Sequence, residues 1–300
     1  MTVTVIWVAY RTPVDMLRAS VDSVRAAAKK SGDELDLILV DNGGAAHLAD
    51  AIPGIRVLGE GLNVGFGHAV NEGVRHARGE YVLMMNPDST AHPDLFQEFA
   101  RASGSANEGT MFGALLEKDG RPQVHAYNVW WSSLALALRK RAWAEELDTV
   151  VRLGSPTAVA RLCGAGWFAR RDDLAALGPF DDGFFLYGED VDLSLRAKRA
   201  GHSLTLVPRA VILHDAGTSS EGSSALVERA RTDAHLRLTA IHRGYVRSLA
   251  ARLESALITI AGALLTRSTG ARRARMARLQ ELWRWGFKRI APRFDPSSSA

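Results

Sequence analysis

Apolar segments of strand length alternate with amphipathic segments over roughly the first hundred residues. The strand-like segments cover residues 3–9, 35–40, 55–58 and 81–85. Thr12 is expected to cap a helix whose first position is Pro13, and a second helix is expected from Gly65 to about Ala77. Strands that alternate with helices in this way predict a parallel sheet covered by helices.

The bulk composition narrows the class of protein. The chain has 300 residues with 47% hydrophobic content, enough for a sizeable core, and a net charge of only +4, which by itself does not indicate nucleic-acid binding. The lone Cys163 excludes an intramolecular disulfide framework. We expect no signal peptide, because the first residues run directly into a strand pattern. The uncharged run Ser255 to Thr266 is shorter than the roughly 20 residues of a spanning helix, so a cytoplasmic, non-spanning protein is expected.

Polar residues follow several predicted strands. Tyr10, Arg11, Asp41 and Asp88 each lie just past a strand end, where ligands bind in parallel α/β sheets. Asp41 either contacts a nucleoside or forms the turn in "DNGG", and for this residue alone the turn is favoured. Asp88, in "MMNPDS", is either a ligand of a divalent cation or part of an Asx turn.

The segment "GLNVGFGHAVNEG" places Gly65 and Gly67 at a helix N-terminus, where backbone N–H groups and the helix dipole attract phosphate. It is not a Walker A loop. A second polar patch, "VPRAVILHDAGTSS", ends a strand at His214 and Asp215. A histidine there is either a hydrogen-bonded structural residue or a ligand.

The stretch "FFLYGEDVDLSLR" crowds Glu189, Asp190 and Asp192 into the first turn of a predicted helix. The helix dipole explains acidic residues in this position without a functional site. Successive helical positions point about 100° apart, so the three acids cannot all face one cleft. We therefore expect one acid to carry chemistry and the others to serve as caps or positioning groups.

In this order the patches resemble family 2 glycosyltransferases, specifically their bacterial rhamnosyltransferase-like branch. The resembling segments run from Val5 to Ser220: "VIWVAYRTP", "LILVDNGG", "LNVGFGHAVNEG", "ARGEYVLMMNPDS", "LCGAGWFARRDDLAALGPFDDGFFLYGEDVDLSLRAKRAG" and "VPRAVILHDAGTSS". The resemblance implies a GT-A fold, an α/β Rossmann-like nucleotide-sugar-binding domain with a mostly parallel central sheet.

The resemblance also assigns site residues. The donor-binding residues it implies are Ala9, Tyr10, Arg11, Asp41, Asn63, Gly65, Asn71, Arg78, Asn86 and Asp88. Asp88 and His214 would bind Mg²⁺ or Mn²⁺, Asp190 would be the general base, and Glu189 would position the acceptor. Trp167 and Phe185 would form an apolar wall against a sugar, with ordinary core packing as the favoured alternative. One departure is "GGAAHL" after "VDN", where the family usually has Ser, Thr and Asp.

The implied reaction is inverting, metal-assisted transfer of a sugar from a nucleotide-diphosphate donor to an acceptor hydroxyl, as in cell-wall or polysaccharide biosynthesis. The expected donor is dTDP-rhamnose, and the acceptor is a glycan, a lipid-linked molecule or a small molecule. Two alternatives are a nucleotidyltransferase that makes nucleotide sugars and a non-catalytic sugar-nucleotide-binding module. The first would be expected to carry a glycine-rich basic motif near the N-terminus, which "VIWVAYRTPVDML" does not contain.

The predicted domain is 1–225, with a donor half of about 1–105 and an acceptor half of about 106–225, and a helical extension with a disordered tail follows over 226–300. The middle, about 105–160, is expected to be irregular. From Thr266 to Ile290 the chain carries eight basic residues against Glu281 alone, with apolar residues at helical spacing. Such a helix lies on the inner face of an anionic membrane or forms a homodimer, and the sequence leaves both open.

Overall fold

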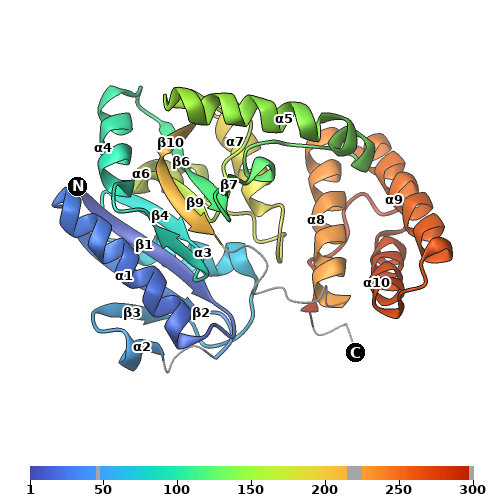
Figure 1. Ribbon diagram of the computed structural model, residues 1–300. Coiled ribbons are helices and arrows are strands. Elements are labelled where there is room, and N and C mark those ends of the chain that lie inside the picture. The colour runs from blue at the N-terminus through green and yellow to red at the C-terminus, as the bar shows by residue number, and fades with distance from the viewer. Residues whose placement is uncertain (45–47, 215–224, 297–300) are drawn as a thin grey trace.

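A ten-stranded mixed sheet forms the centre of the molecule in a computed structural model that describes residues 1–44, 48–214 and 225–296 (Figure 1). The strand order is β3-β2-β1-β4-β9-β6-β10-β5, with β7 beside β6 and β8 beside β10. The strands are β1 (Thr2–Ala9), β2 (Glu34–Asp41), β3 (Ile55–Leu58), β4 (Tyr81–Met85), β5 (Ser89–Ala91), β6 (Thr110–Lys118), β7 (Arg121–Pro122), β8 (Thr157–Ala158), β9 (Gly166–Arg170) and β10 (Ser203–His214).

The N-terminal half of the sheet is parallel, as the sequence predicts. Strand β1 pairs in parallel with β2 and β4, and β2 pairs in parallel with β3. The predicted helices are α1 (Val14–Ser31) and α3 (Phe66–His76). The predicted Thr12 cap is wrong, because Pro13 itself occupies the N-cap position in an extended conformation and α1 begins at Val14 without a side-chain cap.

The second half of the sheet is mixed. Strand β9 lies antiparallel between β4 and β6, while β6 and β10 are parallel, with a register shift between Val207 and Val211. The prediction of an irregular middle is wrong. Residues 105–160 contain β6 and the 21-residue helix α5 (Ser133–Leu153).

Helices cover both faces of the sheet. Helices α1 and α4 (Leu95–Ser105) pack on one face, where Leu17 and Phe99 join the same core cluster as Val5. Helices α3, α6 (Arg171–Leu177) and α7 (Glu189–Arg199) pack on the other, where Val70 and Leu193 share a cluster with Ile6. Burial on both faces explains why these strands are continuously apolar rather than alternating.

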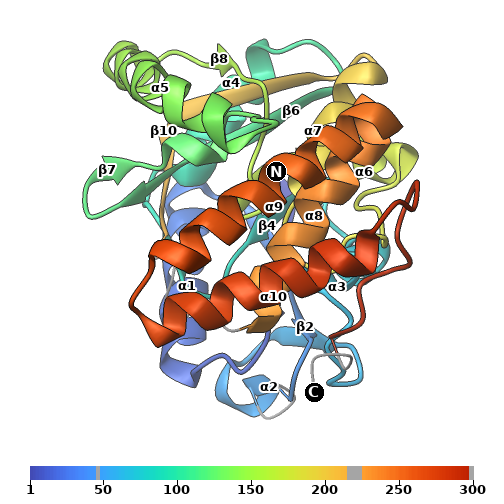
Figure 2. The same cartoon turned by 90° about the vertical axis from the view of Figure 1, so that its right-hand side faces the viewer.

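Three long helices follow the sheet domain: α8 (Ala225–Arg243), α9 (Tyr245–Leu265) and α10 (Thr269–Trp285). Helix α8 contacts both others and also α7, and Figure 2 shows α9 and α10 running side by side as the outer layer. The predicted boundary between residues 225 and 226 coincides with the start of α8, although the division into domains stays a prediction.

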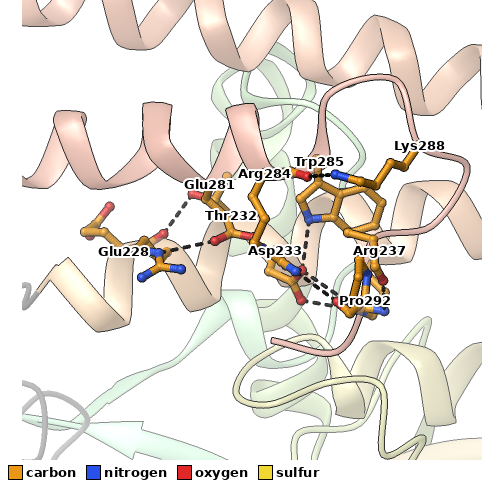
Figure 3. A network of polar contacts seen from close by, with 11 residues as sticks. Glu228, Thr232, Asp233, Arg237, Glu281, Arg284, Trp285, Lys288 and Pro292 are labelled. Carbon is orange, nitrogen blue, oxygen red and sulfur yellow. Dashed lines mark hydrogen bonds and ion pairs between the residues drawn. The ribbon is translucent and has the colours of Figure 1, made fainter. Parts of the chain in front are cut away.

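A buried polar network holds these helices together (Figure 3). At its centre Asp233 accepts hydrogen bonds from Trp285 Nε1 at 2.9 Å and from Arg237 Nε and Nη2 at 3.1 Å, and it is also paired with Arg284. Arg237 continues to the Pro292 carbonyl at 2.9 Å, so the chain after α10 is tied back onto α8.

Candidate active site

The polar strand ends predicted from the sequence lie at one edge of the sheet. Because β1, β2 and β4 are parallel, their carboxyl ends at Ala9, Asp41 and Met85 share that edge. Ligands bind at this edge in open α/β sheets. The antiparallel β9 begins there as well, since Gly166 is paired with Met85.

Asp41 makes the turn that its sequence context suggests and also faces the loop 59–65, which is called the donor loop below. Its Oδ1 accepts a hydrogen bond from Gly43 N at 3.0 Å. A Cβ added at Gly61 would lie 3.4 Å from Asp41 Oδ2, so the loop 59–65 passes close to this carboxylate. Asp41 can therefore form the turn with one carboxylate oxygen and face the predicted nucleoside site with the other.

Tyr10 and Arg11 follow buried Ala9 at the end of β1. The Tyr10 ring is partly exposed, packs over Gly43 and carries the Arg11 guanidinium 5.3 Å from its centroid. Arg11 has a positive φ of 51°, which is uncommon outside glycine and occurs often at functional loops. Both side chains are thus held together beside the Asp41 turn.

Asn42 organises the donor loop and was missed by the sequence analysis. Its Nδ2 donates to Asn63 Oδ1 at 3.2 Å, and its Oδ1 accepts from Val64 N at 2.9 Å. Asn63 Oδ1 also accepts from Gly65 N at 3.3 Å. The signal was present in "DNGG", but a single asparagine after a strand has too many ordinary uses to be assigned.

Gly65 joins the donor loop to Phe185, just before the first turn of α7, which carries Glu189, Asp190 and Asp192 and is called the acidic turn below. It has φ 92°, and a Cβ there would overlap the Phe185 carbonyl oxygen. That same carbonyl accepts a hydrogen bond from Phe66 N at 3.0 Å. The first amide of α3 is therefore already engaged, which corrects the expectation that it is free for a phosphate.

Asn71 fixes the loop that leads to the acidic turn. Its Nδ2 donates to Phe180 O at 2.9 Å and to Asp182 Oδ1 at 3.1 Å, and its Oδ1 accepts from Phe180 N at 2.9 Å. The side chain acts between α3 and residues 180–182, so its role in shaping the donor cleft is indirect.

The assignment of Arg78 to the nucleotide is wrong. Its backbone N donates to Thr4 Oγ1 and Asp36 Oδ2, both at 3.1 Å, at the amino ends of the strands. The five residues of β4 then separate it from the carboxyl edge, about 16 Å at the usual rise per residue. The exposed Arg78 side chain therefore starts from the opposite edge of the sheet.

Asp88 and His214 come together from distant parts of the chain. Asp88 Oδ1 lies 3.6 Å from His214 Nε2, and Asn86 Nδ2 lies 3.1 Å from the same nitrogen. Gln123 binds the other side of His214: its Oε1 lies 3.3 Å from Nδ1 and its Nε2 donates to the backbone carbonyl at 2.9 Å. The hydrogen bonds with Asn86 and Gln123 are satisfied together by the neutral tautomer with its proton on Nδ1.

This arrangement fits a divalent cation. A neutral imidazole whose other nitrogen is fixed by a hydrogen bond is a typical metal ligand, and a carboxylate oxygen lies beside it. Within residues 1–44, 48–214 and 225–296 no group of three or more potential ligand side chains is found, so phosphates and water would complete the coordination. Asp215 lies outside the described residues.

Glu189 and Asp190 lie buried in the first turn of α7, next to a buried arginine. Arg161 Nη2 donates to Asp190 Oδ2 at 2.7 Å, and Arg161 Nη1 donates to the His125 carbonyl at 3.1 Å. The Arg161 guanidinium also lies 5.9 Å from the Trp130 ring centroid. Arg161 was missed, because nothing in "VARLCG" distinguishes it from a surface arginine.

The two neighbouring acids differ in their surroundings. Burial, followed by the charge of Asp190, raises the pKa of Glu189 to about 8. Glu189 Oε2 is buried without a hydrogen-bond partner among the described residues, whereas Asp190 is paired with Arg161. The turn therefore holds one carboxyl that binds a proton near neutral pH and one compensated carboxylate.

Asp192 has a structural role, although its contacts differ from a simple helix cap. Its carboxylate accepts from Arg196 Nε at 2.7 Å and lies 2.8 Å from His242 Nε2 of α8. Burial alone would raise its pKa, but the hydrogen bonds from His242 and Arg196 lower it overall. The acidic turn is thereby anchored to the C-terminal helices.

The two predicted acceptor-binding aromatics are both covered. Trp167 lies within the core on β9 and is fully buried, so it presents no face to an acceptor, which corrects its assignment. Phe185 packs against Phe294 with 5.3 Å between ring centroids and is also buried. The predicted apolar wall is therefore occupied by the chain's own C-terminal segment.

Comparison with known proteins agrees with this arrangement. The family model "Glycosyl transferase family 2" matches residues 4–152, and "Glycosyl transferase family group 2" matches residues 81–231, half of the chain. The chain belongs to glycosyltransferase family 2. Together the two matches span every element of the candidate site, from β1 to β10.

Two relatives of this family 2 member are named as rhamnosyltransferases. The N-acetylglucosaminyl-diphospho-decaprenol L-rhamnosyltransferase of Mycobacterium tuberculosis (strain ATCC 25618 / H37Rv) is 27% identical over 203 residues, 60% of this chain and 66% of that protein. Rhamnosyltransferase WbbL of Escherichia coli (strain K12) is 30% identical over 166 residues, 50% of this chain and 60% of that protein. The chain thus spans 60–66% of these relatives' lengths.

Solved structures confirm the predicted GT-A fold. GalNAc-T7 with UDP, GalNAc and Mn²⁺ superposes with a TM-score of 0.61 at 14% identity, over 94% of this chain and 54% of that one. The mannosyltransferase PcManGT from Pyrobaculum calidifontis, in complex with GDP-Man and Mn²⁺, gives 0.56 at 16% identity, over 94% and 87%.

Proposed function

We propose that this family 2 member is an inverting glycosyltransferase that moves a sugar from a nucleotide-diphosphate donor to an acceptor hydroxyl. Two contacts of the donor loop and the start of α3 carry the proposal: Gly65 approaches the Phe185 carbonyl, and Gly67 approaches the Glu189 side chain. The donor loop and the acidic turn are about 120 residues apart in the sequence, and these contacts support assigning them to one site.

Asp190 is the proposed general base. One of its carboxylate oxygens takes the proton of the acceptor hydroxyl as that oxygen forms a bond to the anomeric carbon, and the bond from this carbon to the diphosphate breaks. Arg161 orients the carboxylate and compensates its charge. Glu189, whose pKa is raised to about 8 chiefly by burial, carries a proton at neutral pH and can donate a hydrogen bond to the acceptor.

Asp88 and His214 are the proposed ligands of Mg²⁺ or Mn²⁺, which when bound would offset the charge that develops on the leaving diphosphate. Gln123 holds the His214 ring in the tautomer whose Nε2 carries no proton, and Asn86 contacts that nitrogen. Support for a metal comes from this donor set and from the Mn²⁺ in the two superposed structures.

L-rhamnose, supplied as dTDP-rhamnose, is the proposed donor sugar. It is supported by the names of the two relatives, both rhamnosyltransferases. The acceptor belongs to cell-wall or polysaccharide biosynthesis on the same grounds, as a glycan or lipid-linked molecule.

The test is incubation of the protein with Mg²⁺ or Mn²⁺ and a panel of nucleotide sugars that includes dTDP-rhamnose. We expect metal-dependent donor binding and release of a nucleoside diphosphate. Binding of no donor would overturn the proposal. Release of pyrophosphate from a nucleoside triphosphate and a sugar phosphate would instead identify a nucleotidyltransferase, and binding without turnover a non-catalytic module.

Asp190→Asn distinguishes the role of Asp190 as general base from a role in donor binding. The amide keeps the shape and the contact with Arg161, so donor binding should persist, while transfer should fall by about 10²- to 10⁴-fold. Asp172→Asn, an exposed surface acid paired with Arg171, is the matched control and should keep wild-type transfer. Transfer by Asp190→Asn near the wild-type rate would show that the base is another residue.

A further inference from the structure

A stripe of exposed apolar side chains runs along helix α9. Its members recur at intervals of seven, four, three and four residues and lie on one face: Val246, Leu253, Leu257, Ile260 and Leu264. Leu264 is 79% exposed. Helix α9 packs on α8 and α10 with its other side, so this stripe faces away from the molecule.

Helix α10 and the residues after it extend the same surface. Met276, Trp283, Phe287 and Ile290 are exposed at intervals of seven, four and three residues, and Trp283 is 88% exposed. Figure 2 shows the two helices side by side across the outer side of the molecule. We call this face, made of the two apolar stripes, the outer helix face.

The exposed charges around the outer helix face are positive, and Glu254, the acid of α9, is half-buried. The basic side chains at its border are exposed: Arg247, Arg267, Arg272, Arg273, Lys288 and Arg289. Glu281 is the one acid between 266 and 290, but it is fully buried and paired with Arg229 and Arg284. It therefore does not offset the exposed positive charge.

Helix α9 is long and apolar enough to cross a membrane by length and composition, and 22% of its apolar stretch is buried. This differs from the sequence expectation, which counted only the uncharged run after Glu254. The contacts favour a helix that lies flat. Arg252, in its middle, is buried and donates to the Gly286 carbonyl at 2.6 Å and to the Lys288 carbonyl at 2.8 Å, contacts that fix α9 along the segment after α10.

We propose that the outer helix face binds the surface of a bilayer that contains anionic lipids, with α9 and α10 lying in the plane of the interface. Aliphatic side chains would enter the boundary of the acyl chains, Trp283 and Phe287 would lie at headgroup level, and the arginines would contact lipid phosphates. A second copy fits less well, because a two-fold interface through this face would place the same arginine rows close to one another. The proposal does not depend on the donor, the base or the metal.

The experiment is sedimentation of the full-length protein with vesicles of phosphatidylcholine alone or of phosphatidylcholine with about one third phosphatidylglycerol, at low and high salt. We expect binding to the anionic vesicles that weakens at least several-fold at high salt, because exposed charges are screened. Equal binding to neutral and anionic vesicles, or binding to neither, would overturn the proposal.

A matched pair of variants locates the surface. Leu264→Glu, near the end of α9, should reduce vesicle binding by about tenfold or more. Leu153→Glu, at the end of α5 and 70% exposed, should bind as the wild type does. Equal losses in both variants would contradict the assignment of the outer helix face. Unchanged thermal unfolding and donor binding show that either variant is folded.

Arg272→Gln with Arg273→Gln tests the charge contribution separately. The double variant should keep the apolar stripe but lose most of the preference for anionic vesicles and most of the salt dependence. Light scattering of the lipid-free protein then tests the alternative that a second copy of the chain covers this face. A stable dimer that Leu264→Glu converts to a monomer would overturn the membrane assignment in favour of a second copy.

Discussion

Asp233 in the C-terminal helices and Asp190 in the acidic turn are both buried aspartates next to arginines, yet their surroundings differ. Asp233 accepts hydrogen bonds from Arg237 through two nitrogens, from Trp285 and from Arg284 (Figure 3). Asp190 has one ion pair among the described residues, with Arg161. Its neighbour Glu189 keeps a buried oxygen, and Arg161 a buried Nε, without a partner there.

A carboxylate whose oxygens are saturated by donors is suited to holding helices together, because any new contact would have to displace one already made. Asp190, in contrast, can accept further hydrogen bonds. The buried polar atoms beside it, Glu189 Oε2 and Arg161 Nε, lower the stability of the fold, because they lose their hydrogen bonds to water. That cost is typical of functional sites. The acid cluster around Asp233 therefore has a structural role, whereas the cluster around Asp190 has the features of an active site.

The largest expected effect is on the structural cluster. Asp233→Ala removes the acceptor shared by Arg237, Arg284 and Trp285, and it takes away the carboxylate that is paired with buried Arg237. The free energy of unfolding should fall by about 3–5 kcal/mol. Thermal unfolding should show a drop on the order of 10 °C. Asp148→Ala, an exposed acid on α5, is the control. A drop no larger than that of the control would break the distinction between the two clusters.

Gly65→Ala tests the contact that brings the donor loop to the acidic turn. Gly244 has nearly the same backbone conformation, with φ 84° and ψ 170°, against φ 92° and ψ 159° at Gly65, but open space where a Cβ would lie. Both alanine variants should lose about 1–3 kcal/mol from backbone strain. Only Gly65→Ala should also lose donor turnover, because its Cβ would displace Phe185. Equal turnover in both variants would show that the contact is dispensable.

Gln123→Ala tests whether His214 binds the metal. Without Gln123 the His214 ring loses the partner of its Nδ1, and affinity for Mn²⁺ should fall by about 10- to 100-fold. The measurement is Mn²⁺ titration of donor binding. Gln280→Ala, exposed on α10, should leave the titration unchanged. An unaltered Mn²⁺ affinity in Gln123→Ala would argue against His214 as a ligand.

Glu189 should make the stability of the protein depend on pH. Its pKa in the folded protein, about 8, lies above its ordinary value of 4.5, so the folded state keeps a proton that the unfolded state releases between these pH values. Stability from this group is therefore lost as the pH rises through that window. Glu189→Gln cannot ionise, so its melting temperature relative to wild type should rise from pH 5 to pH 9, whereas exposed Glu60→Gln should show no trend. A flat difference for Glu189→Gln would contradict the raised pKa.

Local sequence patterns predict the individual elements and the strand ends. Residues 3–9, 55–58 and 81–85 form strands as predicted, because a continuous apolar run bounded by turn residues suits a strand buried on both faces. The acidic stretch starts α7, since carboxylates favour a helix N-terminus. Asp41 and Asp88 were placed at the carboxyl edge by the same local reasoning.

Which residues contact one another follows from the packing of the folded chain. Arg161, Gln123 and His242 reach their partners across 29, 91 and 50 residues, and no local pattern marks such contacts. Arg78 was misassigned because a motif does not say at which edge of the sheet its residues lie, and Trp167 because aromatic rings suit both a sugar surface and a core. Pairing, burial and strand direction are properties of the assembled sheet, and they arise from packing between segments that the one-dimensional pattern describes separately.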